Sequence, residues 1–267
     1  MAIRVCVAGV TGWTGCAVAK AILTSQEFEL TGGISRRAKG RDVGEVLGMH
    51  RTGLAVSSTL TDALAQPADV LVDFTSPESV KQRTLDALAH DVPVVVGTSG
   101  LTAADYVDIE HAARERRLGV IAAGNFSITA ALAKHFALLA ARHLPSWEII
   151  DYAHAQKPDA PSGTTRELAE ALGEMAQNKL EMPVEQTHGD RKARGASIGG
   201  AQVHSVRLPG YVLAFETVFG LPHERLTIRH DAGPSAEPYV QGTLLAIRRV
   251  MQVVGLVRGL DRLLFES

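Results

Sequence analysis

The sequence predicts an α/β protein, in which a Rossmann-type parallel sheet carries a smaller inserted α+β domain. The first observation is that apolar, strand-like runs alternate with helical patterns through the first half of the chain. The second is a glycine-rich turn, residues 9–15, between the first apolar run and a helix. The third is a long amphipathic helix followed by closely spaced strands in the second half. We expect residues 1–125 with 233–267 to form one domain and residues 126–232 the other.

The bulk composition is that of an ordinary globular protein and excludes several classes. The 267 residues are 46% hydrophobic and 21% charged, and the net charge of −2 creates no field toward nucleic acid or anionic membranes. No run of about 18 apolar residues occurs. Residues 1–4 lead directly into a strand, without the features of a signal peptide. Cys6 and Cys16 are interpreted as core residues without disulfide or metal spacing. We expect a cytoplasmic enzyme without a metal, a nucleic-acid partner or a membrane partner.

Buried parallel strands are predicted where a short apolar run is bounded by turn residues. In the first half these runs are residues 3–8, 28–34, 68–74, 92–96 and 118–122. One helix runs from the glycine turn to about Ser25, and a second opens at Ser76 with proline at its first position. A third opens at the capping box of Thr102 and Asp105. The repeated strand–helix order implies right-handed crossovers and one parallel sheet.

The second half begins with an amphipathic helix over residues 128–144 and a strand over 147–154. A loop at 158–163, a helix from about 165 to 178 and an irregular polar stretch at 179–200 follow. Turn residues at 209–210 and 221–223 then predict an antiparallel block of three strands, residues 201–207, 211–220 and 225–231. The last helices, about 236–254 and 260–265, are expected to pack on the first domain.

The glycine turn is the predicted cofactor site. Glycines permit a tight turn and let the backbone approach a pyrophosphate, while the helix behind offers N–H groups and the positive end of its dipole. The alternative is a tight turn without a ligand, but the buried strand before it and the helix after it favour a dinucleotide. The candidate contacts are Gly9, Thr11, Gly12, Trp13, Thr14 and Gly15.

The end of the second strand predicts which dinucleotide is bound. An acidic residue there would bind the ribose 2′-hydroxyl of NAD, but this chain has Ser35, Arg36 and Arg37. Two guanidinium groups suit a 2′-phosphate, so NADP is the preferred cofactor and NAD the alternative. Two solvated surface arginines are the other interpretation.

Two further strand ends are expected to flank the nicotinamide and its ribose, because ligands of parallel sheets bind beyond the carboxyl ends of the strands. The residues concerned are Phe74, Thr75, Gly97, Thr98 and Ser99. The alternative role of these loops is helix capping.

The predicted substrate site lies where the strand ending near His154 is followed by a loop and a helix. Ser162, Gly163 and Thr164 would present N–H groups and hydroxyls at the helix N-terminus, a site suited to a carboxylate. Lys157 would add a positive charge or deliver a proton. The stretch 164–167 also predicts a capping box. A rigid proline loop with a routine cap is the alternative, but it leaves the lysine unexplained.

The stretch KPDAPSGT, residues 157–164, resembles the KxDAPSGT motif of the dihydrodipicolinate reductase family, lysine-pathway enzymes that reduce 4-hydroxy-tetrahydrodipicolinate. Other stretches similar to the family follow in order along nearly the whole chain: residues 7–15, 72–78, 95–102, 123–127, 203–207 and 216–220. The resemblance implies a nucleotide domain closed by the C-terminal segment, an inserted domain for substrate binding and tetramerisation, and a homotetramer. It implies that Lys157 and His154 are catalytic and contact substrate, and it adds as cofactor contacts Gly124, Asn125 and Phe126.

The chain departs from the family pattern at several positions. Where the family has two adjacent histidines, this chain has Ala153 and His154, so the residue usually assigned as proton donor is an alanine. The arginine of the family's DFTxPE stretch is Ser76, its Glu-Arg ribose pair is Ser35-Arg36, and its SSR segment is replaced by residues 233–236. Alanine cannot donate a proton. The reaction therefore needs another donor or another substrate.

The leading functional interpretation is hydride transfer from NADPH to a C=N or conjugated C=C carbon of a small carboxylate. Lys157 or His154 would give the proton. The lysine-pathway compound is the first candidate substrate, and a related imine or amino acid is the second, toward which the departures lean slightly. A catalytically silent NADP-binding subunit is the alternative from another class. Ala153 favours that alternative, and the retained KPDAPSGT loop opposes it.

Overall fold

The computed structural model describes residues 1–265, which form two compact units. Unit 1 contains residues 1–128 and the C-terminal segment from Ala236, and unit 2 contains residues 129–235. The sequence places the boundaries at 125/126 and 232/233, whereas the contacts of the structure place them at 128/129 and 235/236. Residues 266 and 267, the expected end of the first domain, lie outside the described residues.

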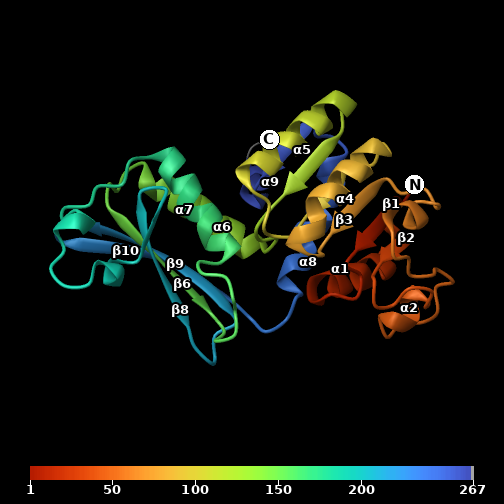
Figure 1. The fold of residues 1–267 in the computed structure, drawn as a ribbon, viewed down its shortest axis with the longest axis horizontal. Helices are drawn as coiled ribbons and strands as arrows, with labels where there is room; N and C mark the ends of the chain where they lie inside the picture. Colours follow the sequence, from red (N-terminus) through yellow and green to blue (C-terminus); the bar gives the residue numbers. More distant parts are fainter. Residues whose placement is uncertain (266–267) are drawn as a thin grey trace. The chain divides into compact units, whose positions relative to one another are not determined.

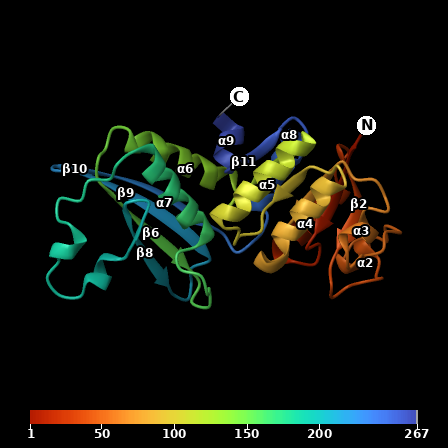
Figure 2. The same cartoon turned by 45° about the horizontal axis from the view of Figure 1, so that its top comes forward.

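Unit 1 is built on a parallel sheet with helices on both faces, the Rossmann-type arrangement that the sequence predicts (Figure 1). Within residues 1–265 this sheet has six strands in the order β11-β5-β4-β3-β1-β2. Helices α4 and α5 lie side by side on one face (Figure 2), and α1 packs with α8. The strands are β1 (Ile3–Ala8), β2 (Phe28–Ile34), β3 (Val70–Asp73), β4 (Val94–Val96), β5 (Gly119–Ala122) and β11 (Gly255–Arg258).

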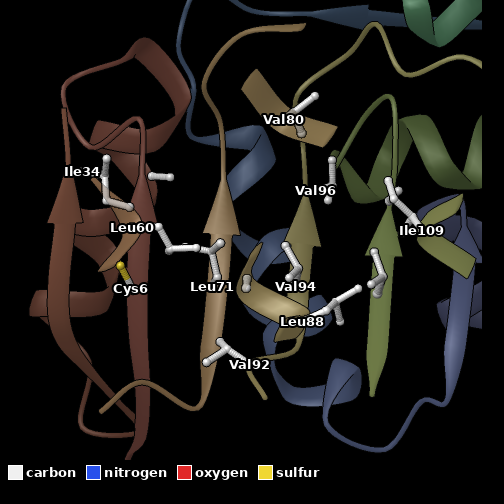
Figure 3. Close-up of a cluster of buried hydrophobic side chains, with 14 of the residues drawn as sticks. Cys6, Ile34, Leu60, Leu71, Val80, Leu88, Val92, Val94, Val96 and Ile109 are labelled. Carbon is white, nitrogen blue, oxygen red and sulfur yellow. The ribbon is translucent and has the colours of Figure 1, made fainter. Parts of the chain in front are cut away.

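β1 shows why these runs fold as central strands. Its successive side chains point to opposite faces, and all four residues from Val5 to Ala8 are fully buried. Cys6 and Ala8 belong to the apolar cluster that Figure 3 shows, with Leu71 and side chains of α4 and α5. Burial raises the pKa of the Cys6 thiol to about 12, so this cysteine packs as an apolar residue. Cys16 was also expected in the core but is only half-buried.

The helix starts of unit 1 follow the sequence signals closely. Thr102 and Asp105 form the predicted capping box of α5. Ser76 is the N-cap of α4 with proline at the next position, but its hydroxyl bonds the Ser79 hydroxyl at 3.3 Å. The long helices are α1 (Trp13–Leu23), α4 (Pro77–Ala89), α5 (Ala103–Arg116) and α8 (Pro238–Val250).

Among the short elements of unit 1, β11 and the two short helices after β2 carry no clear sequence signal, whereas the helix at 260–265 is predicted. The helix predicted over 236–254 ends at Val250, and the chain then enters β11 through Gly255, whose φ is +91°. β11 pairs in parallel with β5 and becomes an edge of the sheet. The predicted helix at 260–265 is α9 (Leu260–Phe265), and two short helices follow β2: α2 (Val43–Val46) and α3 (Leu60–Ala63).

Unit 2 is a mixed sheet with α6 (Ile128–Ala141) and α7 (Gly163–Met175) packed on one face. Within the described residues the strand order is β10-β9-β6-β8-β7. The stretch 179–200, expected to be irregular, contains two short 3-10 helices and β7. The strands are β6 (Trp147–Ala153), β7 (Ala196–Ile198), β8 (Ala201–Arg207), β9 (Leu213–Leu221) and β10 (Glu224–Ala232).

The predicted antiparallel block of three consecutive strands is confirmed for β9 and β10, but β8 does not pair with β9. β6 lies between β8 and β9 and runs parallel to β8, so the turn at 209–210 joins two strands that flank β6. Trp147 and Ile149 of β6 are almost completely buried, and this apolar strand takes the centre of the sheet. Turn residues reveal only local hairpins, such as the one between β9 and β10.

Within residues 1–265, no helix is both long enough and apolar enough to cross a membrane. The described residues also contain no group of three or more His, Cys, Asp or Glu side chains placed to hold a metal ion.

Candidate active site

The glycine turn after β1 is built from closely packed backbone. Gly9 has a φ of +83°, and a Cβ at Gly9 would lie 2.1 Å from the carbonyl oxygen of Phe74. A Cβ at Gly15 would lie 2.2 Å from the carbonyl oxygen of Gly9. Gly12 is the N-cap of α1, so no side chain of the described residues caps this helix. The N–H groups of the first turn, from Trp13, Thr14 and Gly15, therefore suit a bound anion.

The ends of β1 and β2 are joined by a side-chain hydrogen bond. Ser35 is buried, and its hydroxyl lies 2.8 Å from the Thr11 hydroxyl. Arg36 and Arg37 follow on an exposed turn. A hydrogen bond from the Ser76 side chain and, to a smaller extent, the charge of Arg36 lower the pKa of Glu78. The charge of Arg36 therefore acts on a residue in the first turn of α4.

A buried aspartate organises the ends of β3 and β4. Asp73 is fully buried, and its Oδ2 accepts a hydrogen bond from Nη1 of Arg83 at 2.8 Å. Its Oδ1 accepts from the hydroxyls of Thr75 at 2.6 Å and Thr98 at 2.9 Å. Arg83 also donates to the Thr75 hydroxyl at 2.7 Å. Thr75 and Thr98, both predicted cofactor contacts, are thus held by one buried ion pair.

The remaining predicted contacts of unit 1 lie at the same edge of the sheet, because β1 to β5 are parallel. A Cβ at Gly97 would lie 2.0 Å from ring carbon Cε1 of Phe74, so these two residues are in close contact. The Phe74 ring packs edge-on against Phe126, with ring centroids 5.9 Å apart. Three residues lie nearer the surface: Ser99 and Gly124, which are exposed, and Asn125, which is half-buried.

The KPDAPSGT segment forms the loop between β6 and α7. The Lys157 N–H donates to the carbonyl oxygen of His154 at 3.1 Å, so both predicted catalytic residues share one turn. The Lys157 ammonium pairs with Oδ1 of Asp159 at 2.7 Å, and its side chain is 21% exposed. His154 is exposed, and the Ala160–Pro161 peptide bond is cis.

Asp151 of β6 lies buried at the N-terminus of α7. Its Oδ1 accepts from the Ser162 hydroxyl at 2.6 Å, and its Oδ2 accepts from the Ser162 N–H at 2.9 Å. The Thr165 hydroxyl donates to Oδ1 at 2.9 Å. Both Ser162 donors are therefore directed at Asp151. Substrate binding by Ser162 stays a prediction, as it does for the first two residues of α7, Gly163 and Thr164.

The predicted capping box at 164–167 is wrong. The N-cap of α7 is Ser162, whose hydroxyl oxygen accepts from the Thr165 N–H at 3.3 Å. Glu167 instead pairs with Lys134 of α6 at 2.6 Å. Ser162 takes the cap position because Asp151, on the strand that precedes the loop, fixes it there, and the local capping pattern does not contain that contact.

The Asp151 carboxyl is ionised at neutral pH despite its burial. Burial by itself raises its pKa, but hydrogen bonds from Ser162, Arg207 and Thr165 outweigh this effect, and the pKa lies below its ordinary value. Ala153 lies two residues after Asp151, on the same face of β6. It is fully buried, and it is the register partner of Arg207 in the neighbouring strand β8. The position that the family fills with a histidine thus belongs to the interior of unit 2.

Four charged residues around these sites, Asp73, Arg83, Asp151 and Arg207, were missed by sequence reasoning. Asp151 carried a usable signal, because it is in phase with Trp147 in an alternating strand and so falls on the buried face. A buried carboxylate needs partners, which predicts that this position organises its surroundings. The arginines gave no signal, since their partners are distant in sequence.

The fold and the glycine turn are those of a Rossmann-type dinucleotide-binding protein. Two family models match the chain, dihydrodipicolinate reductase N-terminus over residues 3–126 and dihydrodipicolinate reductase C-terminus over residues 125–264. The chain belongs to the dihydrodipicolinate reductase family of NAD(P)H-dependent oxidoreductases.

Individual relatives agree with this assignment over the whole chain. The 4-hydroxy-tetrahydrodipicolinate reductase of Desulfitobacterium hafniense is 39% identical over 264 residues, which cover 98% of both chains. That of Moorella thermoacetica is 37% identical over 266 residues, again 98% of each chain. The solved dipicolinate-bound dihydrodipicolinate reductase of Paenisporosarcina is 32% identical with a TM-score of 0.80, covering 98% of this chain and 99% of that one. An amine dehydrogenase of Mycobacterium smegmatis, 18% identical with a TM-score of 0.70 over 97% of this chain and 95% of its own, shares the fold.

Proposed function

We propose that this chain reduces 4-hydroxy-tetrahydrodipicolinate, with NADPH in preference to NADH. The observation that carries the proposal is the KPDAPSGT loop, in which Lys157 pairs with Asp159 between the end of β6 and the N-terminus of α7. The reductases of that name, which match nearly the whole chain, support it further. They favour the lysine-pathway compound over the related imine or amino acid toward which the sequence departures lean.

Unit 1 supplies the dinucleotide site in this proposal. The uncapped first turn of α1 and the packed glycine backbone fit a pyrophosphate. Arg36 and Arg37 bind the 2′-phosphate, and Thr75 and Thr98 flank the nicotinamide ribose. NADPH supplies the hydride when it is bound.

Unit 2 supplies the substrate site. The positive end of α7, at Gly163 and Thr164, and the Lys157 ammonium bind a carboxylate. Lys157 also gives the proton to the substrate, because Ala153 has none to give. His154, which is exposed in the same turn, is the alternative donor.

The decisive assay follows NADPH oxidation with enzymatically generated 4-hydroxy-tetrahydrodipicolinate, beside a panel of cyclic imino acids. Turnover of the first compound at a kcat of about 1–10³ s⁻¹ is the expected result. Turnover of the other imino acids alone would show that the chain reduces a related substrate instead of 4-hydroxy-tetrahydrodipicolinate. NADPH binding without oxidation in any of these mixtures would identify the silent subunit.

Two Lys157 variants separate its charge from its proton. Lys157→Ala is expected to lower kcat by about 10²–10⁴-fold, the usual contribution of general acid catalysis. Lys157→Arg keeps the positive charge but does not release a proton at neutral pH. Its KM for substrate should therefore stay near the wild-type value while its kcat stays low. A wild-type kcat in Lys157→Arg would move the proton donor to His154, which His154→Ala then tests.

We further propose a homotetramer assembled through unit 2 and a cytoplasmic location. The sheet face opposite α6 and α7 presents half-buried apolar side chains, among them Ile150, Val206 and Val218, which suits self-association. Cys6 and Cys16 are both free thiols, as is usual in a reducing compartment. Light scattering of the purified protein measures the assembly, and a monomeric mass at all concentrations would contradict it.

A further inference from the structure

We infer that Asp151 and Arg207 are positioning residues that fix the Lys157 loop in its reactive geometry, an inference that rests on the proposed function of that loop. Both lie on strands of the unit 2 sheet, Asp151 in β6 and Arg207 at the end of β8. The Asp151 side chain is 1% exposed and that of Arg207 is 16% exposed. The pair is therefore shielded from water on the sheet face that α7 covers.

Asp151 holds the far end of the loop. The chain leaves β6 after Ala153, passes Lys157 and returns at Ser162. There the Asp151 carboxylate accepts both the hydroxyl and the N–H of Ser162, at 2.6 and 2.9 Å. One carboxylate on the strand that starts the loop thus also fixes the residue that ends it.

Arg207 holds the middle of the loop. Its Nη2 donates to Oδ2 of Asp151 at 2.7 Å and to the main-chain carbonyl oxygen of Asp159 at 2.6 Å. The Asp159 carboxylate in turn pairs with the Lys157 ammonium at 2.7 Å. Arg207 therefore fixes the main chain of Asp159, and the Asp159 side chain in turn fixes the Lys157 ammonium. A continuous series of contacts runs from Asp151 through Arg207 and Asp159 to Lys157.

The chemistry of the Asp151–Arg207 pair suits a positioning role better than a stabilising one. A buried ion pair contributes little to stability compared with apolar side chains of the same shape, but it fixes direction and distance. A planar guanidinium can bind a carboxylate and a carbonyl oxygen at once, which a lysine ammonium on a flexible stem does less well. A displacement of a reacting group by about 1 Å costs about 10²-fold in rate.

The test compares Arg207→Met, Arg207→Lys and Asp151→Asn with Arg194→Met as the control. Arg194 pairs with Glu148, which is also in β6, but within the described residues it makes no hydrogen bond or ion pair with the loop or with Asp151. Five quantities are measured for each variant. They are amide hydrogen exchange of the segment 154–163, kcat and KM for 4-hydroxy-tetrahydrodipicolinate, the Kd for dipicolinate, and the Kd for NADPH.

For Arg207→Met we expect faster exchange in the segment 154–163, weaker dipicolinate binding and a kcat lower by about 10²-fold. The Kd for NADPH should stay unchanged, and Arg207→Lys should recover part of the lost kcat. Arg194→Met should match the wild type in all five quantities. If Arg207→Met does not fold, Arg207→Lys and Asp151→Asn decide by the same criteria.

Wild-type exchange and wild-type kcat in a folded Arg207→Met protein would overturn the inference. An equal loss of NADPH affinity and of kcat would also overturn it, because it would mark a general loss of structure. If the wild type does not reduce 4-hydroxy-tetrahydrodipicolinate, the proposed function fails on its own. Loop exchange and dipicolinate affinity then still decide whether the pair positions the loop.

Discussion

Gly12 is the residue at which one added side chain should affect dinucleotide binding most. A Cβ there would already lie 3.1 Å from the Gly9 carbonyl oxygen, and a carboxylate would occupy the space beside the α1 N-terminus. We expect Gly12→Asp to abolish NADPH binding by filling the pyrophosphate space and adding like charge. Gln26→Asp adds the same charge beyond the other end of α1 and should bind normally. Fluorescence titration with NADPH measures both, and undiminished affinity in folded Gly12→Asp would remove this assignment.

Arg36 and Arg37 test the choice of cofactor. Only NADPH carries a 2′-phosphate, and a hydrogen bond to a charged group contributes about 1.5–3 kcal/mol. Replacing both residues with alanine should therefore raise the Kd for NADPH far more than the Kd for NADH. Arg41→Ala, an exposed arginine slightly further along the chain, is the matched control. Equal losses of affinity for NADPH and NADH would show that these arginines do not bind the 2′-phosphate.

At the scale of residues, the sequence predicted glycines and surface charges better than it predicted buried charges. The glycine turn follows β1 and Arg36 follows β2, and these positions after a strand indicate a dinucleotide site. Asp73 and Asp151 act through partners on other elements, Arg83 and Arg207. The pairing partners leave no local pattern, so the predicted sites contain candidate ligand contacts and omit the buried charges that hold them.

Helix α4 offers an element-scale test, because two of its basic residues point in different directions. Arg83 pairs with fully buried Asp73, whereas Lys81 pairs with Asp105 and Asp108 of α5 on a more exposed face. Arg83→Met should lower the free energy of unfolding by about 3–5 kcal/mol, since it leaves a buried carboxylate without its counter-charge. Lys81→Met should cost no more than about 1 kcal/mol.

The same Arg83→Met variant should raise the Kd for NADPH, because Thr75 and Thr98 lose the network that holds them. Chemical denaturation and NADPH titration give the two measurements. Lys81→Met is the control for both. A folded Arg83→Met protein with the NADPH affinity of the wild type would show that the network serves stability alone.

At the scale of elements, β1, β2 and the capping box of α5 were predicted at their observed positions. Each is specified by residues close together in sequence. β11 and the pairing of β6 with β8 were missed, because both depend on partners far along the chain. Strands with a long apolar run of their own are thus specified locally, whereas strand order and the short edge strand β11 depend on distant partners.

Across the whole molecule, carboxyl groups with lowered pKa values predict how stability depends on pH. The Lys81 ammonium and Thr102 lower the pKa of Asp105 to about 2, and the Arg4 side chain lowers that of Asp69. In unit 2, Arg229 lowers the pKa of Asp231, and hydrogen bonds lower that of Asp151 despite its burial. In the unfolded chain an aspartate titrates near about 3.9. These groups therefore stabilise the fold above that pH and lose this contribution as the pH falls through their folded pKa values.

We accordingly expect a stability plateau at neutral pH and acid unfolding that begins below about pH 4, where unfolded aspartates start to bind protons. Circular dichroism across pH measures the transition. Asp151→Asn should be less stable than the wild type at neutral pH, and the difference should shrink at low pH. Asp62→Asn, at an exposed position, is the control. A difference between Asp151→Asn and the wild type that does not depend on pH would contradict this account.

The parallel sheet of unit 1 is completed by β11, whose residues lie at 255–258, although its neighbour β5 ends at Ala122. During synthesis, β5 therefore emerges from the ribosome long before its partner. Until β11 arrives, β5 exposes a bare row of backbone donors and acceptors, the kind of edge on which chains aggregate. The ribosome synthesises all of unit 2 during this interval, so the nascent chain carries an open sheet edge until the last residues of unit 1 emerge.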